Sequence, residues 1–270
     1  MATSEASAKT RRATAPLAAY VLHQHDWSES SLIVELFTRT QGRVVVAAKG
    51  AKRPTSNFRA VLLPFVPILA HLGKSPADEQ GEVHNLRSAE WAGGQPLLAP
   101  AAMFSGFYIN ELLLKLLARQ DPHPALFDAY AGTLAALATQ QDAAEEAAVL
   151  RAFELLLLRA LGVLPELATA TLTTQPVQAT ARYTLHAEGG LIADADGLPG
   201  SHWVTLEAGL AHAAGSGQAH ALRQACMATA GALRGPLRGL LHYHLGHSQL
   251  RTRQVWRGVQ RLAETFKSAP

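Results

Sequence analysis

Apolar and polar residues alternate in short runs over the first third of the chain, which is the spacing of β-strands with one buried face. Three valines at residues 44–46 favour the extended state, and Gly42 and Gly50 punctuate the ends of that run. Pro64 and Pro67 restrict the strand around them to an edge, a strand start or a bulge. The pattern predicts five strands, over residues 17–23, 31–38, 42–49, 65–72 and 82–87.

Helical spacing replaces this alternation after a connector that contains Gly and Pro, residues 91–100. Ile109, Leu112, Leu113 and Leu116 recur at the i, i+3, i+4 and i+7 positions of one helix face. The spacing predicts a helix over residues 101–119, a second that begins at Pro124, and a third over residues 143–161.

The helical pattern lapses between Gly162 and Ser216, where a Gly189-Gly190 pair between two extended apolar runs predicts a hairpin. Helices are predicted again over residues 218–232, with a restart at Pro236, and a last helix opens with Ser248 as its N-cap.

Together these elements predict an α+β protein, with an N-terminal five-stranded OB-fold β-barrel followed by an α-helical C-terminal domain. The predicted organisation is a flexible tail over residues 1–16, the barrel over 17–90, a connector over 91–100 and the helical domain over 101–270. An irregular, hairpin-bearing insert is expected within the helical domain at about 163–216.

Composition narrows the class further. Apolar residues make up 48% and charged residues 17% of the 270, the balance of a soluble globular protein. Cys226 is the single cysteine, so neither an internal disulfide nor a zinc site built on a cysteine pair can form. Apolar runs are too short to span a membrane, and the first residues resemble no signal peptide. With a single cysteine, we expect a cytoplasmic protein without a metal or cofactor, which would be nucleoid-associated if its partner is a nucleic acid.

The net charge of +3 hides a strong segregation, because residues 1–60 carry +5 and residues 221–270 carry +7, whereas residues 101–220 carry −7. Clustered cations concentrate the electrostatic field and attract polyanions. The segment from Lys49 to Arg59 has four cations and no acid. Such a loop either binds phosphates or is an ordinary solvated loop. The candidate DNA-binding residues are Arg39, Arg43, Lys49, Lys52, Arg53 and Arg59.

Aromatic rings that stack on bases accompany basic grooves in proteins that bind single strands. Trp27 and Phe58 have polar sequence neighbours and are candidates for base stacking, whereas Phe37 and Phe65 lie in apolar strands and are expected in the core.

A cationic stripe and an apolar stripe are predicted on opposite faces of the last helix. The apolar face carries Val255, Val259, Leu262 and Phe266. The cationic face carries Arg253, Arg257 and Arg261, and these residues with Arg251 are candidates for contact with an anionic partner, either a second nucleic-acid strand or an acidic protein segment. A solvated helix face and a membrane-surface helix are the alternative interpretations.

His242, His244 and His247 invite a metal hypothesis, but positions i and i+2 of a helix do not face one another, so structural histidines are the favoured interpretation. The sequence contains no phosphate-binding loop, dinucleotide fingerprint or nucleophile elbow. We therefore expect a binding protein and not an enzyme.

Five further segments are informative by their order and spacing: AYVLHQHDWSESSLIVELFTRTQGRVVVAAKGAKRP at residues 19–54, LLPFVPIL at 62–69, NELLLKLLARQDPHPALFDAY at 110–130, LRAFELLLLRALGVLPEL at 150–167 and HYHLGHSQLRTR at 242–253. Together these segments resemble the bacterial RecO family of DNA-repair recombination mediators. The resemblance spans nearly the whole chain, and its specificity lies in the order and spacing of the motifs.

The resemblance implies a protein that binds single- and double-stranded DNA, anneals complementary strands and consumes no nucleotide. It also implies action with RecR, and in some bacteria RecF, to load RecA recombinase onto strands coated by single-stranded-DNA-binding protein (SSB). The acidic SSB tail ends in an apolar residue, so its pocket should combine Arg or Lys with an apolar groove between helices. Many family members carry a four-cysteine zinc site after LGVLPEL, but Ala170 and Thr173 stand there in this sequence, and we expect packing to hold the hairpin.

Two other functions remain open from the residues alone. An RNA-binding OB protein of translation or RNA decay would share the basic loop, although the long helical part argues against it. A metal hydrolase that uses the histidine cluster would bind stoichiometric metal, which a metal assay detects.

Overall fold

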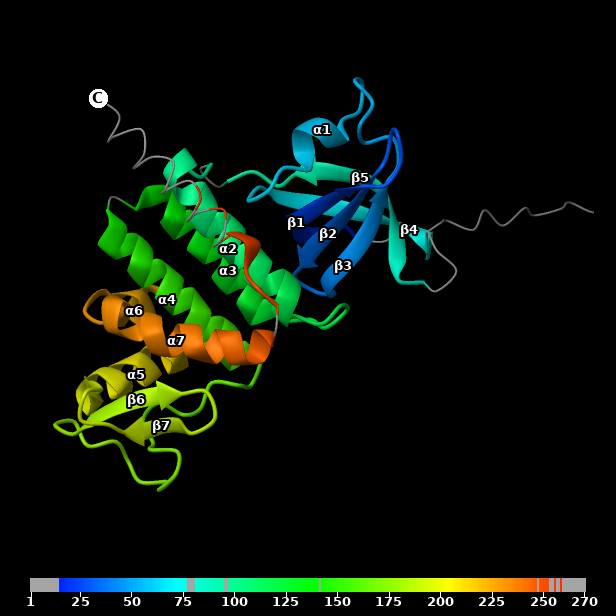
Figure 1. Cartoon of the computed structure of the whole chain (residues 1–270). Helices are drawn as coiled ribbons and strands as arrows, with labels where there is room; N and C mark the ends of the chain where they lie inside the picture. Colours follow the sequence, from blue (N-terminus) through cyan, green and yellow to red (C-terminus); the bar gives the residue numbers. More distant parts are fainter. Residues whose placement is uncertain are drawn as a thin grey trace, which may run out of the picture.

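A computed structural model describes residues 15–76, 81–94, 97–140, 142–246, 248–252, 255 and 258 of the chain. A β-barrel lies beside a helical body, and a small sheet lies at the far end of the helices from the barrel (Figure 1). Most of the predicted tail, and Arg253, Arg257 and Arg261 of the predicted last helix, lie outside the described residues.

The five strands of the barrel close in the order β1-β2-β3-β5-β4, with β1 antiparallel to β4 at the closure and β3 parallel to β5. This order confirms the predicted OB-fold barrel. The strands are β1 (Leu17–Asp26), β2 (Leu32–Thr38), β3 (Gly42–Ala48), β4 (Pro67–Pro76) and β5 (Val83–Trp91).

A short helix, α1 (Phe58–Val61), lies between β3 and β4 and packs Phe58 and Val61 against the barrel core. The sequence pattern indicates only a loop here, because four residues are too few to display a helical period. The fourth strand begins at Pro67 and not at Phe65, whose φ of +67° is incompatible with an extended strand.

Three long helices form the first part of the helical body, as the apolar periodicity predicts: α2 (Pro100–Leu116), α3 (Pro124–Thr139) and α4 (Ala143–Ala160). Pro100 and Pro124 occupy first turns, where no backbone hydrogen bond is lost. Asp142 caps α4 by accepting hydrogen bonds from the amides of Ala144 and Glu145, each at 2.8 Å.

The prediction of an irregular insert at 163–216 is wrong in its second half, which forms the helix α5 (Gly200–Ser216). Ala and Gly dilute the hydrophobic contrast of this helix, but Trp203, Leu206 and Leu210 are buried on one face. The predicted hairpin exists as β6 (Arg182–His186) and β7 (Gly190–Ala193), to which β8 (Leu198–Pro199) adds a third strand.

The hairpin is also tied to the loop that precedes it. Thr171 donates its amide to the carbonyl of Leu191, and the Leu191 amide donates to the Thr171 hydroxyl, both at 2.8 Å. Gly190 has φ of +66°, and a Cβ there would lie 2.3 Å from the Thr171 hydroxyl oxygen. Hydrogen bonds and a close approach therefore hold this lobe, in addition to the packing that the sequence leads us to expect.

Pro236 does not restart a helix, so that prediction is wrong; it lies inside α7 (Ala230–Leu245), which follows α6 (His220–Met227). Leu233, Leu237, Leu240 and Leu241 are buried on both sides of the proline. Burial of this continuous apolar face outweighs the hydrogen bond that proline removes from a helix interior.

Barrel and helical body share one core. Tyr20 of β1 and Phe37 of β2 belong to the same buried cluster as α2, α3 and α4, and both rings lie 5.4 Å from Phe127 of α3. Phe37 and Phe65 are buried, as predicted. Asn110 of α2 donates to the β1 carbonyls of Val21 at 3.4 Å and Leu22 at 3.1 Å.

We expect Asn110→Ala to lower the free energy of unfolding by about 1–3 kcal/mol, because it leaves β1 carbonyls and the Tyr130 hydroxyl without their buried partner. Tyr130 donates to Asn110 at 2.6 Å, so the cost of Asn110→Ala combined with Tyr130→Phe should be less than the sum of the single costs. Urea unfolding measures these values, and Thr205→Ala, at an exposed hydroxyl, is the control. A cost below about 0.5 kcal/mol for Asn110→Ala would contradict the expected role.

Candidate nucleic-acid interface

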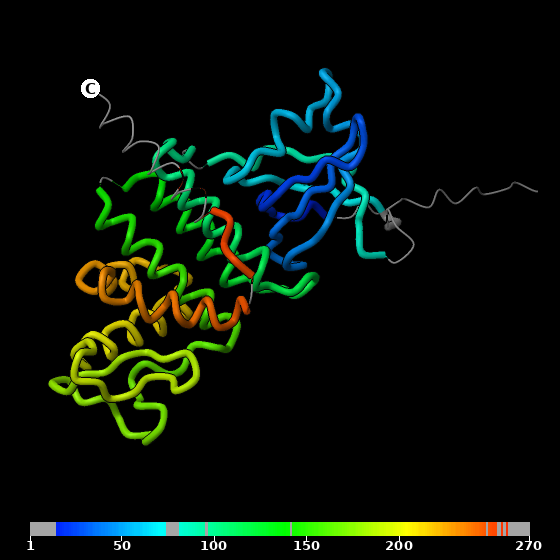
Figure 2. Tube along the Cα trace, viewed as in Figure 1, coloured from blue at the N-terminus to red at the C-terminus, as the bar shows by residue number. Residues whose placement is uncertain are grey.

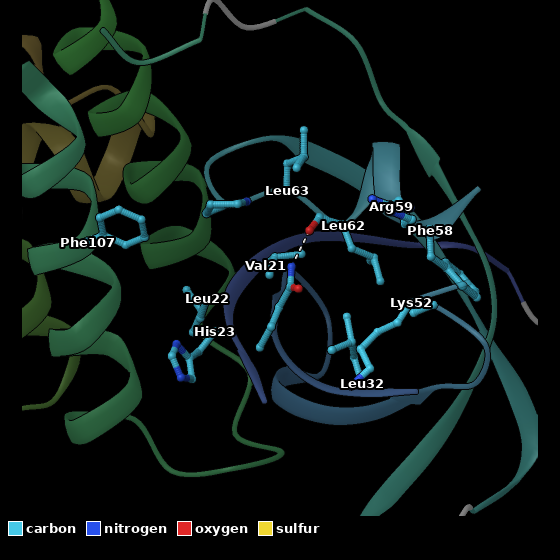
Figure 3. Close-up of a pocket in the computed structure, with 13 residues that line it drawn as sticks. Val21, Leu22, His23, Leu32, Lys52, Phe58, Arg59, Leu62, Leu63 and Phe107 are labelled. Atoms are coloured by element: carbon cyan, nitrogen blue, oxygen red, sulfur yellow. Dashed lines mark hydrogen bonds between the residues drawn. The ribbon is translucent and has the colours of Figure 1, made fainter. Parts of the chain in front are cut away.

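A cleft of about 620 Å³ opens where the barrel meets α2 (Figure 3). Phe107 of α2 lies on one side of it, Lys52 and Phe58 lie on the other, and Leu63 lies at the rim. Gln24 of β1 donates to the carbonyl of Leu62 and fixes the segment that follows α1. Apolar side chains thus line a concave surface at which cations from the basic loop also lie.

The basic loop is tied to the β1–β2 turn. The Lys52 amide donates to the carbonyl of Ser30 at 2.9 Å, and the Gly50 amide donates to the Ser31 hydroxyl at 3.3 Å. These bonds bring Lys52 to the cleft, where Arg59 also lies. Lys52 forms an ion pair with Asp26 at 3.2 Å, whereas Lys49 and Arg53 are exposed beside the cleft without lining it.

The two stacking candidates differ in their surroundings. Phe58 lines the cleft, but its ring also packs against the barrel core, so it is half-buried. Trp27 lies in the turn to which the basic loop is tied, and 52% of its surface is exposed. The structure therefore presents one partly available ring inside the cleft and one exposed ring beside the basic loop.

His23 lies in the cleft wall, with its ring 4.4 Å from that of His25. Partial burial lowers the pKa of His23 below its usual 6.5, the neighbouring His25 and Arg251 lower it further, and Glu35 opposes them. His23 is therefore neutral at pH 7.

Arg39 and Arg43 lie at the other end of β2 and are engaged within the molecule. Arg39 donates from Nε and Nη2 to the two carboxylate oxygens of Asp128 in α3, at 2.9 and 2.8 Å. Arg43 is only 14% exposed and donates to Glu35 at 3.1 Å. The structure does not bring these two residues to the cleft, and their ion pairs give them a structural role at the β2–β3 turn.

A second hollow, of about 760 Å³, lies between α2, α4, α7 and the segment that follows α7. Arg234, Arg238 and His242, spaced i, i+4 and i+8 along α7, lie along it, and Arg151 of α4 faces it. Its apolar lining includes Phe104, Leu150, Leu241, Leu245 and Leu250. The i, i+4 spacing of the two arginines could have indicated this surface from the sequence, but the apolar groove beside it depends on three helices.

Arg251 is described and exposed, whereas the predicted cationic stripe of Arg253, Arg257 and Arg261 lies outside the described residues. The helical residues there start at Arg251 and not at Ser248, whose hydroxyl accepts from Lys115 at 2.6 Å. The prediction of Ser248 as an N-cap is therefore wrong.

The histidine cluster, the single cysteine and the possibility of a membrane span can be compared with the structure in turn. His242 and His244 are exposed, and no group of three possible metal ligands occurs in the part of the chain that the structure describes. Cys226 is fully buried, and burial raises the pKa of its thiol to about 12. None of the described helices is long and apolar enough to span a membrane.

The OB barrel with its basic loop and the attached helical body form a two-part protein. The family model for the N-terminal part of recombination protein O matches residues 15–94, and the model for its C-terminal part matches residues 98–254. The chain belongs to the RecO family.

Full-length relatives agree with this assignment. The DNA repair protein RecO of Verminephrobacter eiseniae is 51% identical over 249 residues, which cover 90% of this chain and 96% of the relative. The DNA repair protein RecO of Variovorax paradoxus is 51% identical over 253 residues, and that of Acidovorax ebreus is 48% identical over 253, with the same coverage.

We expect His23 to titrate below pH 6.5 and its pKa to rise in Arg251→Gln, because that change removes a nearby positive charge. The folded chain holds the His23 pKa below its unfolded value, so the unfolded state binds the proton more readily. The contribution of His23 to the free energy of unfolding is therefore fully present above pH 6.5 and is lost as the pH falls through the folded pKa. A proton NMR titration of the imidazole measures both values. Arg182→Gln, in β6, is the control; an unchanged His23 pKa in Arg251→Gln would mean that Arg251 is distant from the cleft.

Proposed function

We propose that this chain is a recombination mediator of DNA repair, which binds single- and double-stranded DNA and anneals complementary strands. With RecR, and with RecF where it is required, it helps load RecA recombinase onto DNA coated by SSB. The observation that carries the DNA-binding part of the proposal is the cation-lined cleft beside the OB barrel. Membership of the RecO family supports the DNA-repair role.

The proposed mechanism is electrostatic. Two DNA strands repel each other, and a protein that neutralises phosphates on both lets complementary bases sample pairing. Lys49, Lys52, Arg53 and Arg59 contact one backbone, and an unpaired base enters the cleft beside Phe58 or stacks on Trp27. Arg251, which is exposed, is the candidate for contact with a second backbone.

The acidic tail of SSB is assigned to the groove between α2, α4 and α7. Arg234 and Arg238 are exposed, and neither forms an ion pair with another described residue. They supply positive charge for carboxylates, while half-buried leucines of the groove receive the apolar terminal residue. We thereby assign the tail contact to α7, whereas the sequence left open whether the arginines of the last helix contact the tail or a second DNA strand.

We expect Arg53→Glu to weaken binding to DNA of any sequence and to reduce the salt dependence of binding, because phosphate contacts carry no base information. Loss of one contact lowers the slope of log affinity against log salt by about 0.7 to 0.9. Arg182→Glu makes the same change of net charge on an exposed residue of β6 and should leave the slope unchanged. Fluorescence anisotropy with DNA and RNA strands of matched sequence measures both quantities. Unchanged DNA binding by Arg53→Glu removes this loop from the interface, and preferential binding of RNA favours the RNA-binding alternative.

We expect Arg238→Glu to weaken binding of a short peptide of aspartates that ends in phenylalanine by at least tenfold, while binding to bare DNA stays within twofold of wild type. The charge reversal places a carboxylate against the acidic ligand. Isothermal titration calorimetry with the peptide, beside DNA anisotropy, separates the two sites. Normal peptide affinity in this variant refutes the assignment of the groove.

A further inference from the structure

Residues 248–252, which we call the closing segment, form one wall of the groove between α2, α4 and α7. Ser248, Gln249, Leu250 and Thr252 line the groove from this side. The segment runs across α2 after α7 has ended (Figures 1 and 2). The groove is therefore complete only while the closing segment is docked.

Glu111 of α2 binds the end of the closing segment. Its two carboxylate oxygens accept the amide of Arg251 at 2.8 Å, the amide of Thr252 at 3.0 Å and the Thr252 hydroxyl at 2.6 Å. The Glu111 side chain is only 11% exposed. Hydrogen bonds to an ionised, largely buried acceptor are stronger than those between neutral groups.

Lys115, one helical turn further along α2, binds the beginning of the segment. Its ammonium group donates to the Ser248 hydroxyl at 2.6 Å and to the carbonyl of Gln249 at 2.7 Å, and it lies 3.6 Å from Glu111. Between the two attachment points, Leu250 packs against the main hydrophobic core. One face of α2 thus holds the segment by polar contacts at both ends and by an apolar contact in the middle.

We propose that Glu111 and Lys115 are positioning residues of the peptide groove, which hold the closing segment as the wall against which an acidic peptide with an apolar end binds. This inference rests on the proposed function, because it takes the groove to be the site of the SSB tail. Neither side chain touches the peptide. They act through Leu250 and Thr252, whose place in the groove they fix.

The arrangement links docking of the segment to binding of the peptide. A ligand that binds only the complete groove stabilises the docked segment, and by the same free energy the docked segment raises the affinity for the ligand. Bound peptide should therefore slow hydrogen exchange at the amides of Arg251 and Thr252, although Glu111 and not the peptide accepts their hydrogen bonds.

The test compares wild type, Glu111→Gln, Lys115→Met and the control Glu207→Gln. In Glu111→Gln, one acceptor oxygen is replaced by an NH₂ group, which is a donor and faces the donor groups of the closing segment. We therefore expect about tenfold weaker binding of the aspartate peptide that ends in phenylalanine. Lys115→Met should also weaken binding of this peptide. Glu207 also accepts a backbone amide and an arginine, at Leu167 and Arg159, away from the groove. Glu207→Gln should lower the melting temperature without changing peptide affinity.

Two outcomes overturn the inference itself, and two others refute the proposed function on which it rests. Wild-type peptide affinity in Glu111→Gln, with a lowered melting temperature, means that Glu111 only anchors the chain end. If that variant does not fold, the wild type still provides a test. Hydrogen exchange at the amides of Arg251 and Thr252 that does not change when the peptide binds shows that the closing segment does not respond to the peptide. Failure of wild type to bind the peptide, or normal binding by Arg238→Glu, instead refutes the proposed function of the groove and removes the ligand on which the inference depends.

Discussion

Burial of one side of the barrel wall against α2 and α3 is the constraint on which the other features of the molecule depend. The side chains of Tyr20 and Phe37 point out of the barrel, and their rings pack into the core of the helical body. Asn110 fixes β1 at the two residues that precede His23. Because β1 is held there, Phe107 of the same helix becomes the second wall of the cleft, and the cleft exists only as a joint product of barrel and helices.

Two groups of described cations have different physical roles. Arg39, Arg43 and Arg119 are paired with Asp128 and Glu35 at the junction of the β2–β3 turn with the helices. Their charges are offset locally, so they add orientation and little long-range field. Other cations of the basic loop and of α7 form no ion pair with another described residue, and their field extends into solvent; they are Lys49, Arg53, Arg59, Arg234 and Arg238, whereas Lys52 is paired with Asp26. Net charge along the chain does not distinguish the two groups, because the distinction depends on which acid lies opposite each cation.

The sequence predicted the features that repeat locally and missed those that depend on distant partners. Five strands and three long helices were predicted from periodicity, and the burial of Phe37 and Phe65 from their apolar neighbours. Helix α5 was missed because its many alanine and glycine residues weaken the contrast between its apolar and polar faces. Pro236 was predicted to restart a helix because the sequence alone does not show how much apolar surface α7 buries. In the candidate site, Lys52, Phe58 and Arg59 come together as the basic loop suggested. The pairing of Arg43 with Glu35, and the groove beside Arg238, could not be predicted without the tertiary fold.

Burial of the Cys226 thiol makes it resistant to the oxidants that also damage DNA. Peroxides oxidise cysteine through its thiolate, and a pKa of about 12 leaves roughly one thiol in 10⁵ ionised at neutral pH. Cys226 is also inaccessible to solvent, and it is the single cysteine of the chain. Hydrogen bonds between Thr171 and Leu191, and not thiolates, tie the hairpin lobe to the preceding loop. Oxidants that break DNA strands therefore react very slowly with the one cysteine of this protein.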